Sequence, residues 1–252
     1  MSVEIFGLKF DDVDVATATR TILARDHLAP FTYVVTPNVD HLARLRGDGG
    51  LAAIYRGAGL RLLDSRVIAH LARLLGHAAP QVATGADLVA ALLPALAARR
   101  ARLCVIGMTA PQAALLETRY PGLDIIHHEP PMGFDRDEAA FEAARRAAVA
   151  AAAPVTLLAV GSPRQERLAA AIAADPAARG VGLCVGAAPL FAIGALRRAP
   201  RLLNHAGLEW LWRLASEPRR LAGRYLWRDP PALLAIGRDL RRTACRTQQS
   251  SR

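Results

Sequence analysis

The chain has 252 residues, of which 52% are hydrophobic, and a formal net charge of +10. Three cysteines are too few for a disulfide framework, and the longest apolar run, Ala147 to Val160, is too short for a bilayer and contains Pro154. Because the N-terminus also lacks the features of a signal peptide, we expect a protein of the reducing cytoplasm with buried thiols at Cys104 and Cys184.

Apolar runs and turn residues alternate along most of the chain. Strands are predicted at 32–35, 60–63, 82–84, 103–106, 123–127, 155–160 and 182–185, after a hairpin or strand at 3–10. Helices are predicted at 15–25, 39–46, 67–75, 85–99, 111–120, 137–152 and 163–174. This alternation favours an α/β fold over residues 1–195: a Rossmann-like open, mostly parallel sheet with helices on both faces.

The pattern changes after about residue 195. Residues 197–252 hold 13 of the 32 basic residues and four of the 22 acidic ones, for a net charge of +9. Helices are expected near 208–215 and 231–240, so we interpret 196–252 as a basic, Trp/Arg-rich helical appendage. Its arginines and aromatic residues are typical of a surface that contacts anionic membranes, although packing of the aromatic residues on the core is an alternative.

The strand at 155–160 is followed by Gly161, Ser162, Pro163 and Gln165. This order predicts a sharp turn, an N-cap at Ser162 and a helix that begins at the proline. The positive end of such a helix suits a diphosphate. Helix capping alone is the plainer interpretation of a single junction.

Similar junctions follow two other strands, at Gly107 to Gln112 and at Thr36-Pro37-Asn38. Asp64 ends the strand at 60–63, and the carboxyl ends of parallel strands meet at one edge of a sheet. We therefore expect Asp64, Thr36 and Asn38 to form a polar pocket with the Gln165 turn. Asp64 supplies the single base that activation of a hydroxyl requires.

Other chemistries have weaker support. Asp12-Val13-Asp14 and Asp135-Arg136-Asp137 have the acid-x-acid spacing of metal sites for nucleotide diphosphates, but each precedes a helix, so we expect capping and no metal. His127 and His128 lack the spacing of a zinc site. The absence of a Gly-x-Gly-x-x-Gly after a strand and of a Walker A sequence disfavours dinucleotide and P-loop sites.

Over residues 30–228 the motifs and their order resemble the WecG/TagA/CpsF glycosyltransferases. The matching segments are Thr36-Pro37-Asn38-Val39-Asp40-His41, Asp64, Thr84-Gly85-Ala86-Asp87, Pro130-Pro131-Met132-Gly133-Phe134, Val160 to Glu166, Arg198-Ala199-Pro200 and Gly207 to Leu214. The resemblance implies an inverting, metal-independent transfer of a sugar from a UDP-sugar to a polyprenyl-diphosphate-linked saccharide, without a cofactor, in cell-surface polysaccharide synthesis.

The resemblance also implies residue roles. Asp64 is the candidate general base, Thr36 and Asn38 position sugar hydroxyls, and Gln165 contacts donor or acceptor. The candidate substrate-binding residues are Thr84, Gly85, Asp87, Gly107, Gly161, Ser162, Glu166, Arg213, Arg220 and Arg224, of which Arg213 and Arg220 would neutralise the leaving diphosphate. The chain departs from the usual motifs at Ser65, at Pro189-Leu190 and at Gly223.

The family further implies peripheral association with the inner face of the plasma membrane through the tail, and a homo-oligomer is compatible with the sequence. No specific nucleic acid is expected as a partner. An alternative is a non-catalytic protein that binds nucleic acid or anionic surfaces through its basic tail, in a salt-dependent manner. A nucleotide-sugar epimerase or reductase is a further alternative, but the chain lacks its glycine fingerprint.

Overall fold

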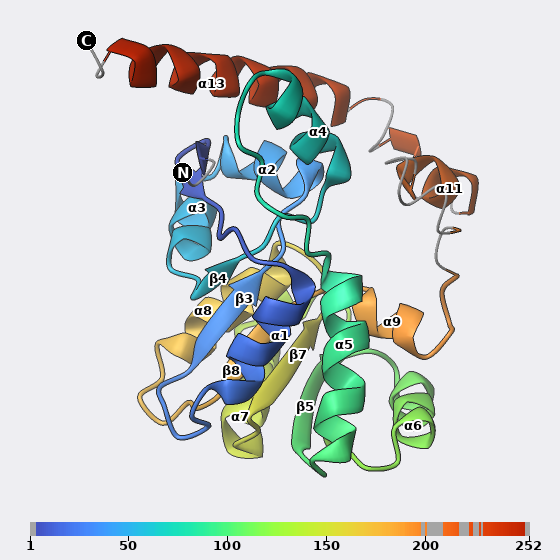
Figure 1. Cartoon of the computed structure of the whole chain (residues 1–252). Coiled ribbons are helices and arrows are strands. Elements are labelled where there is room, and N and C mark those ends of the chain that lie inside the picture. Colours follow the sequence, from blue (N-terminus) through green and yellow to red (C-terminus); the bar gives the residue numbers. More distant parts are fainter. Residues whose placement is uncertain are drawn as a thin grey trace.

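The structure is a computed structural model that describes residues 4–197, 200, 209–216, 222, 223, 227 and 229–249. These residues form a six-stranded, wholly parallel sheet with the strand order β4-β3-β8-β7-β5-β6 (Figure 1). Its strands are β3 (Thr32–Val35), β4 (Leu60–Arg61), β5 (Arg102–Gly107), β6 (Asp124–His128), β7 (Val155–Ala159) and β8 (Val181–Cys184). The predicted α/β class is confirmed.

The central strands are apolar on both faces because both faces are covered, as is usual for parallel sheets. Val34, Val105 and Leu183 belong to one buried cluster. Their chain neighbours Val35 and Cys184 belong to the cluster on the opposite face. The alternation of side chains along a strand therefore divides one continuous apolar run between two cores.

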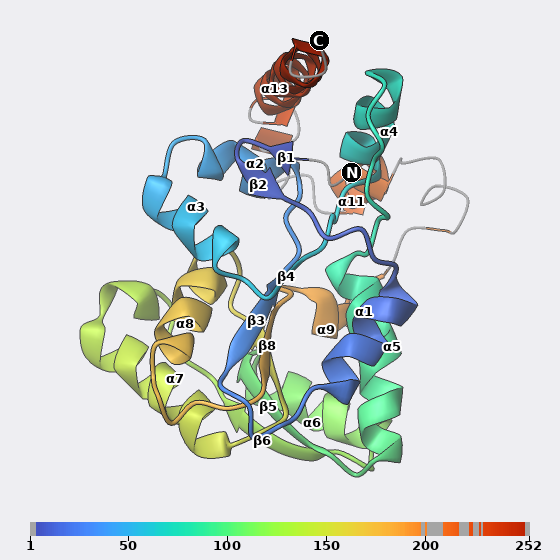
Figure 2. The same cartoon turned by 60° about the vertical axis from the view of Figure 1, so that its left-hand side comes forward.

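Helices form a layer on each face of the sheet (Figure 2). The layer on one face contains α1 (Val15–Ala24), α5 (Gly85–Ala98), α6 (Ala110–Arg119) and α9 (Ala188–Ala192). The layer on the other face contains α2 (Val39–Leu45), α3 (Gly49–Arg56), α7 (Glu138–Ala151) and α8 (Arg164–Ala173). The remaining elements are the hairpin β1 (Glu4–Ile5) and β2 (Leu8–Lys9), α4 (Arg66–Leu74), η1 (Phe134–Arg136), α11 (Glu209–Ser216) and α13 (Asp229–Gln249).

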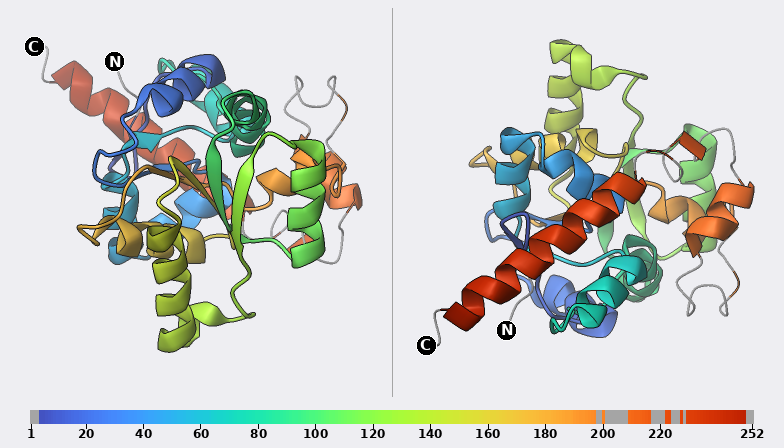
Figure 3. Two further views of the ribbon diagram at one scale, coloured as in Figure 1. Left: turned by 90° about the horizontal axis from the view of Figure 1, so that it is seen from below. Right: turned by 90° about the horizontal axis from the view of Figure 1, so that it is seen from above.

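Helix α13 packs on α2, α4 and β1, at the end of the molecule where α2 and α4 follow their strands (Figure 3, right). Ile236 and Leu240 are completely buried and join the core cluster that includes Val35. The Phe6 backbone N–H donates to Asp239 Oδ2 at 2.7 Å. This helix of the predicted appendage is thus anchored on the α/β core, whereas the division of the chain at residue 195 stays a prediction.

Some sequence predictions were wrong in detail. Helix α3 was not predicted; the Asp48 side chain caps it by accepting from Leu51 N at 2.8 Å, and two glycines, which are weak helix formers, open it. The segment 82–84 is no strand, because only Val82 makes a bridge, to Leu63. The C-terminal helix predicted at 231–240 extends over 229–249.

Cys104 and Cys184 are both buried, as predicted. Burial raises the pKa of the Cys104 thiol to about 12 and raises that of Cys184 well above its usual value. Neither thiol is therefore ionised near neutral pH. Among the helices within the described ranges, none is both long enough and apolar enough to cross a membrane.

The packing of α13 can be tested with Ile236→Ala. This substitution removes a completely buried side chain at the contact with the core, and we expect it to lower the free energy of unfolding by about 2–5 kcal/mol. Leu234 of the same helix is 65% exposed, so Leu234→Ala should change the free energy of unfolding by less than about 0.5 kcal/mol. Urea denaturation of the parent protein and of each variant measures both changes in the free energy of unfolding. Equal effects of the two variants would show that α13 does not pack as described.

Candidate active site

Asp64 lies at the carboxyl edge of the sheet. After β4 the chain continues beside β3, with Leu62 N donating to Val35 O at 2.9 Å and Asp64 N to Pro37 O at 3.0 Å. The half-buried carboxylate then accepts through Oδ2 from Gly85 N, the first residue of α5, at 3.3 Å. Asp64 is thus held at the positive end of a helix, where the helix dipole is favourable for negative charge.

The residues that follow three strands lie close together at Gly85. A Cβ atom at this position would lie 3.2 Å from Thr36 Oγ1 and 3.5 Å from Val185 Cγ1, so only glycine allows this close approach without displacement. Thr36 is 4% exposed, and its hydroxyl donates to Cys184 O at 3.4 Å. The ends of β4, β3 and β8 therefore converge at the N-terminus of α5, as the edge argument predicted for Asp64 and Thr36.

Asn38 and Thr84 act as helix caps next to this point. Asn38 Oδ1 accepts from His41 N at 3.3 Å and caps α2. Thr84 Oγ1 accepts from Asp87 N at 3.0 Å and donates to Asp87 Oδ2 at 2.7 Å, which fixes the start of α5. Their predicted contacts with substrate stay predictions.

Gln165 and Glu166 lie beneath the site rather than on its surface. Gln165 is 2% exposed; its Oε1 accepts from Gly186 N and its Nε2 donates to Glu166 Oε1, both at 2.9 Å. The Tyr55 hydroxyl donates to the same Glu166 oxygen at 3.0 Å. In this conformation Gln165 offers substrate almost no surface, and its evident role is to connect the turn after β7 to the end of β8.

The environment of Tyr55 keeps its hydroxyl protonated, so that it acts as a hydrogen-bond donor. Burial raises the pKa of the Tyr55 phenol far above its usual value, and the neighbouring Glu166 carboxylate raises it further. Glu166 is itself 1% exposed, and its second oxygen has no hydrogen-bond partner among the residues that the structure describes. A buried carboxylate needs such donors, so Tyr55 and Gln165 stabilise it together.

The predicted cap of α8 is wrong. Pro163, not Ser162, occupies the N-cap position, no side chain caps the helix, and the Ser162–Pro163 peptide is cis. The Gln165 amide is engaged with Glu166 and Gly186, so it does not fold back on the helix start. By contrast, the predicted capping box from Thr109 to Gln112 is present at α6.

The predicted glycines at the strand ends have conformational and packing roles. Gly107 has φ +99°, and a Cβ there would lie 2.9 Å from the Ala159 backbone, so glycine permits the approach of β5 and β7. Gly161 has φ +79°, a backbone conformation that favours glycine. Contacts of either residue with a ligand stay predictions.

Arg44 and Tyr55 were not predicted from the sequence. Arg44 Nη1 donates to Ser162 O at 2.8 Å and its Nη2 pairs with Asp40 Oδ2 at 2.5 Å, which connects α2 to the turn before α8. The i,i+4 spacing of Asp40 and Arg44 is the signal that could have found this pair. Tyr55 lies in α3, the helix that was not predicted.

Carboxylates of the two acid-x-acid segments accept hydrogen bonds from backbone N–H groups. Asp14 caps α1 and Asp137 caps α7, as predicted, while Asp12 Oδ1 accepts from Gln81 N at 2.9 Å. Within the part of the chain that the structure describes, no three His, Cys, Asp or Glu residues gather into a metal-binding group. His127 Nε2 lies 3.1 Å from Gly107 O.

The three predicted tail arginines cannot be placed. Arg220 and Arg224 lie outside the described residues, and Arg213 belongs to α11 but its side chain is not described. Their contact with a diphosphate therefore stays a prediction.

Fold and site together define an open α/β protein with a polar, carboxylate-containing site at the carboxyl edge of a parallel sheet, where such proteins bind their ligands. A comparison with protein families is more specific. The model of the Glycosyl transferase WecG/TagA/CpsF family matches residues 3–246, nearly the whole chain, and the chain belongs to this family. It is thus a glycosyltransferase of cell-surface polysaccharide synthesis, a family that suggests a sugar-nucleotide donor and a lipid-linked acceptor.

The buried cluster can be tested with Tyr55→Phe. The substitution removes one of two donors to Glu166 Oε1, so we expect the free energy of unfolding to fall by about 1–3 kcal/mol. Tyr120→Phe is the control, with a change of less than about 0.5 kcal/mol. If chemical denaturation gave the same stability for Tyr55→Phe and the parent protein, the Glu166 carboxylate would not depend on this hydrogen bond.

Proposed function

We propose that the chain is an inverting, metal-independent glycosyltransferase that moves a sugar from a UDP-sugar to a polyprenyl-diphosphate-linked saccharide. The observation that carries this proposal is the position of Asp64, a carboxylate bonded to the N-terminus of α5 beside Thr36 at the carboxyl edge. Membership of the family supports the reaction class, and the named donor and acceptor rest on the sequence resemblance.

In the proposed mechanism Asp64 accepts the proton of the acceptor hydroxyl. The hydroxyl oxygen forms a bond to the anomeric carbon of the donor sugar as the bond from that carbon to UDP breaks. A single displacement of this kind inverts the configuration at the anomeric carbon. The Gly85 N–H holds the base in place, and Thr36 and Asn38 orient sugar hydroxyls next to it.

The leaving group carries negative charge, which must be stabilised as it develops. Arg213, Arg220 and Arg224 of the basic appendage are our proposed source of this stabilisation, in place of a metal ion. The same appendage is our proposed contact with the anionic inner face of the plasma membrane, where a lipid-linked acceptor resides.

The base is tested by Asp64→Asn. Loss of a general base should lower turnover at least about a hundredfold, because an amide does not accept the proton. UDP release is measured with a panel of UDP-sugars, with and without a short-chain polyprenyl-diphosphate-linked sugar, in the absence of added metal. The matched control is Asp124→Asn, the first residue of β6 and thus at the opposite, amino edge of the sheet, with an expected change of less than about twofold.

Acceptor-dependent release from one donor would support the transferase and identify its sugar. Near-normal turnover of folded Asp64→Asn would remove Asp64 from the mechanism. Release that requires added metal would contradict metal independence.

The membrane contact is tested on α13 without removing it, because truncation would also remove Ile236 and Leu240 from the core. Arg238, Arg241 and Arg242 are exposed on this helix. Each basic residue near an anionic surface contributes about 1 kcal/mol, so the triple Arg→Gln variant should bind phosphatidylglycerol-containing vesicles at least about tenfold more weakly.

The control for net charge is a triple Arg→Gln variant at the exposed positions Arg100, Arg119 and Arg146, outside the appendage. It should sediment with the same vesicles as the parent protein does. Equal weakening in the two triple variants would mean that overall charge, rather than α13, determines vesicle binding.

A further inference from the structure

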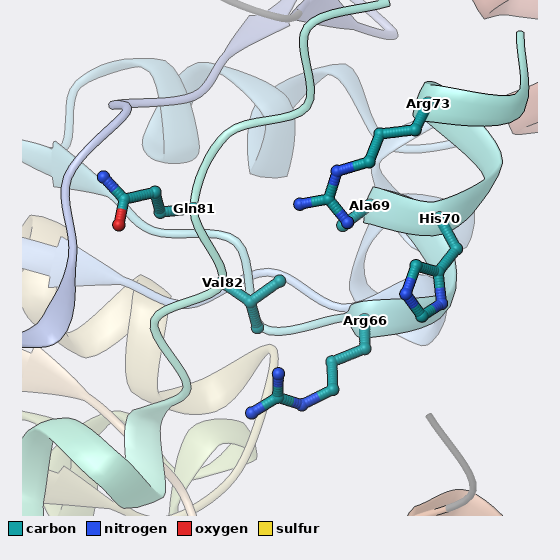
Figure 4. Close-up of a pocket in the computed structure, with 6 residues that line it drawn as sticks. All are labelled: Arg66, Ala69, His70, Arg73, Gln81 and Val82. Carbon is teal, nitrogen blue, oxygen red and sulfur yellow. The ribbon is translucent and has the colours of Figure 1, made fainter. Parts of the chain in front are cut away.

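A cavity of about 240 Å³ opens between α4 and the segment that precedes α5. Its lining residues are Arg66, Ala69, His70, Arg73, Gln81 and Val82. The two arginine side chains extend from α4 toward the segment that carries Gln81 and Val82 (Figure 4). Among the described residues, the lining is thus basic and neutral, with no acidic residue in it.

The basic residues lie on one face of the helix. Arg66, His70 and Arg73 follow the spacing i, i+4 and i+7 and extend over about 10 Å of α4 at 1.5 Å per residue. The side chain of none of the three makes a hydrogen bond or ion pair with a residue that the structure describes, whereas the side chains of Arg44 and Arg61 pair with acids. Convergent basic groups without acidic partners favour an anionic ligand, and guanidinium groups match phosphate oxygens in particular.

The cavity lies directly beside the candidate base. Helix α4 begins at Arg66, two residues after Asp64, and Ser65 caps it. Leu63 and Val82 form a parallel bridge, Ala83 N donates to Leu63 O at 3.0 Å, and Gly85 N donates to Asp64 Oδ2. Both walls of the cavity therefore continue into the two segments that hold the Asp64 carboxylate.

We propose that this cavity, the α4 cationic pocket, binds the diphosphate of the lipid-linked acceptor. The inference rests on the proposed function, which places the acceptor hydroxyl at Asp64. In an acceptor with a single sugar, the diphosphate is attached to the sugar that carries the reacting hydroxyl, so it lies one sugar ring from the base. Leu74, which follows Arg73 at the end of α4, is 83% exposed and supplies an aliphatic surface where a prenyl chain would leave the pocket.

A UDP-sugar also carries a diphosphate, but the geometry of the displacement places the donor diphosphate and the acceptor diphosphate in different regions of the site. The attacking hydroxyl and the leaving UDP lie on opposite sides of the donor's anomeric carbon. The acceptor diphosphate is therefore on the side of Asp64, and the donor diphosphate is on the far side. This assigns the pocket beside Asp64 to the acceptor.

The kinetic test is the double variant Arg66→Gln/Arg73→Gln. At saturating donor, KM for the polyprenyl-diphosphate-linked acceptor should rise at least about tenfold, because charged hydrogen bonds to phosphate are lost, while KM for the UDP-sugar stays within about twofold. The control is Arg100→Gln/Arg119→Gln, which removes the same charge outside the pocket. An unchanged acceptor KM would overturn the inference and leave the proposed function intact.

A binding test does not depend on turnover. Calorimetry with farnesyl diphosphate and, separately, with UDP should show at least about tenfold weaker binding of farnesyl diphosphate to the double variant and unchanged binding of UDP. A selective loss of UDP binding would assign the pocket to the donor and overturn the inference, as would no farnesyl diphosphate binding by the parent protein. Arginine-dependent farnesyl diphosphate binding without sugar transfer would reject the proposed function but retain the pocket.

Discussion

The contact of the start of α5 with three strand ends determines the geometry of the site. A Cβ at Gly85 would lie 3.2 Å from Thr36 Oγ1 and 3.5 Å from Val185 Cγ1, so a larger residue would require a small displacement, and the Gly85 N–H donates to Asp64. A displacement of the helix start by a larger residue would change the distance from its N–H to the Asp64 carboxylate. The segment that leads into this helix carries Gln81 and Val82, which line the α4 cationic pocket, so the base and the pocket are connected through that segment.

A second constraint is the buried carboxylate of Glu166. Desolvation makes such a group costly unless donors surround it, and Tyr55 and Gln165 both donate to one of its oxygens. Because Gln165 also accepts from Gly186, satisfying the carboxylate fixes the turn after β8. This explains why Gln165, which the sequence suggests as a substrate contact or a cap residue, is buried: it organises the backbone beneath the site.

Local signals were enough for most strands and helices, since apolar periodicity and caps such as Asp14 and Asn38 act within a few residues. Parallel-sheet geometry also predicted that Asp64 and Thr36 would lie at one edge. The Tyr55–Glu166 hydrogen bond was not predictable in this way, because it joins residues 111 positions apart. The spacing of Arg66, His70 and Arg73 is visible in the sequence, but the segment that closes their pocket is known only from the fold.

The distribution of charge connects these features to a lipid-linked substrate. Helix α13 buries Ile236 and Leu240 against the core and leaves Arg238, Arg241 and Arg242 exposed, while it packs on α4. The Asp64 carboxylate precedes α4 by two residues, the basic face lies on the helix, and the exposed Leu74 ends it. A polyprenyl-diphosphate-linked sugar has its reacting hydroxyl, diphosphate and aliphatic chain in the same order. Under the proposed function, Asp64 and the helix that follows it would together bind all three parts of the acceptor.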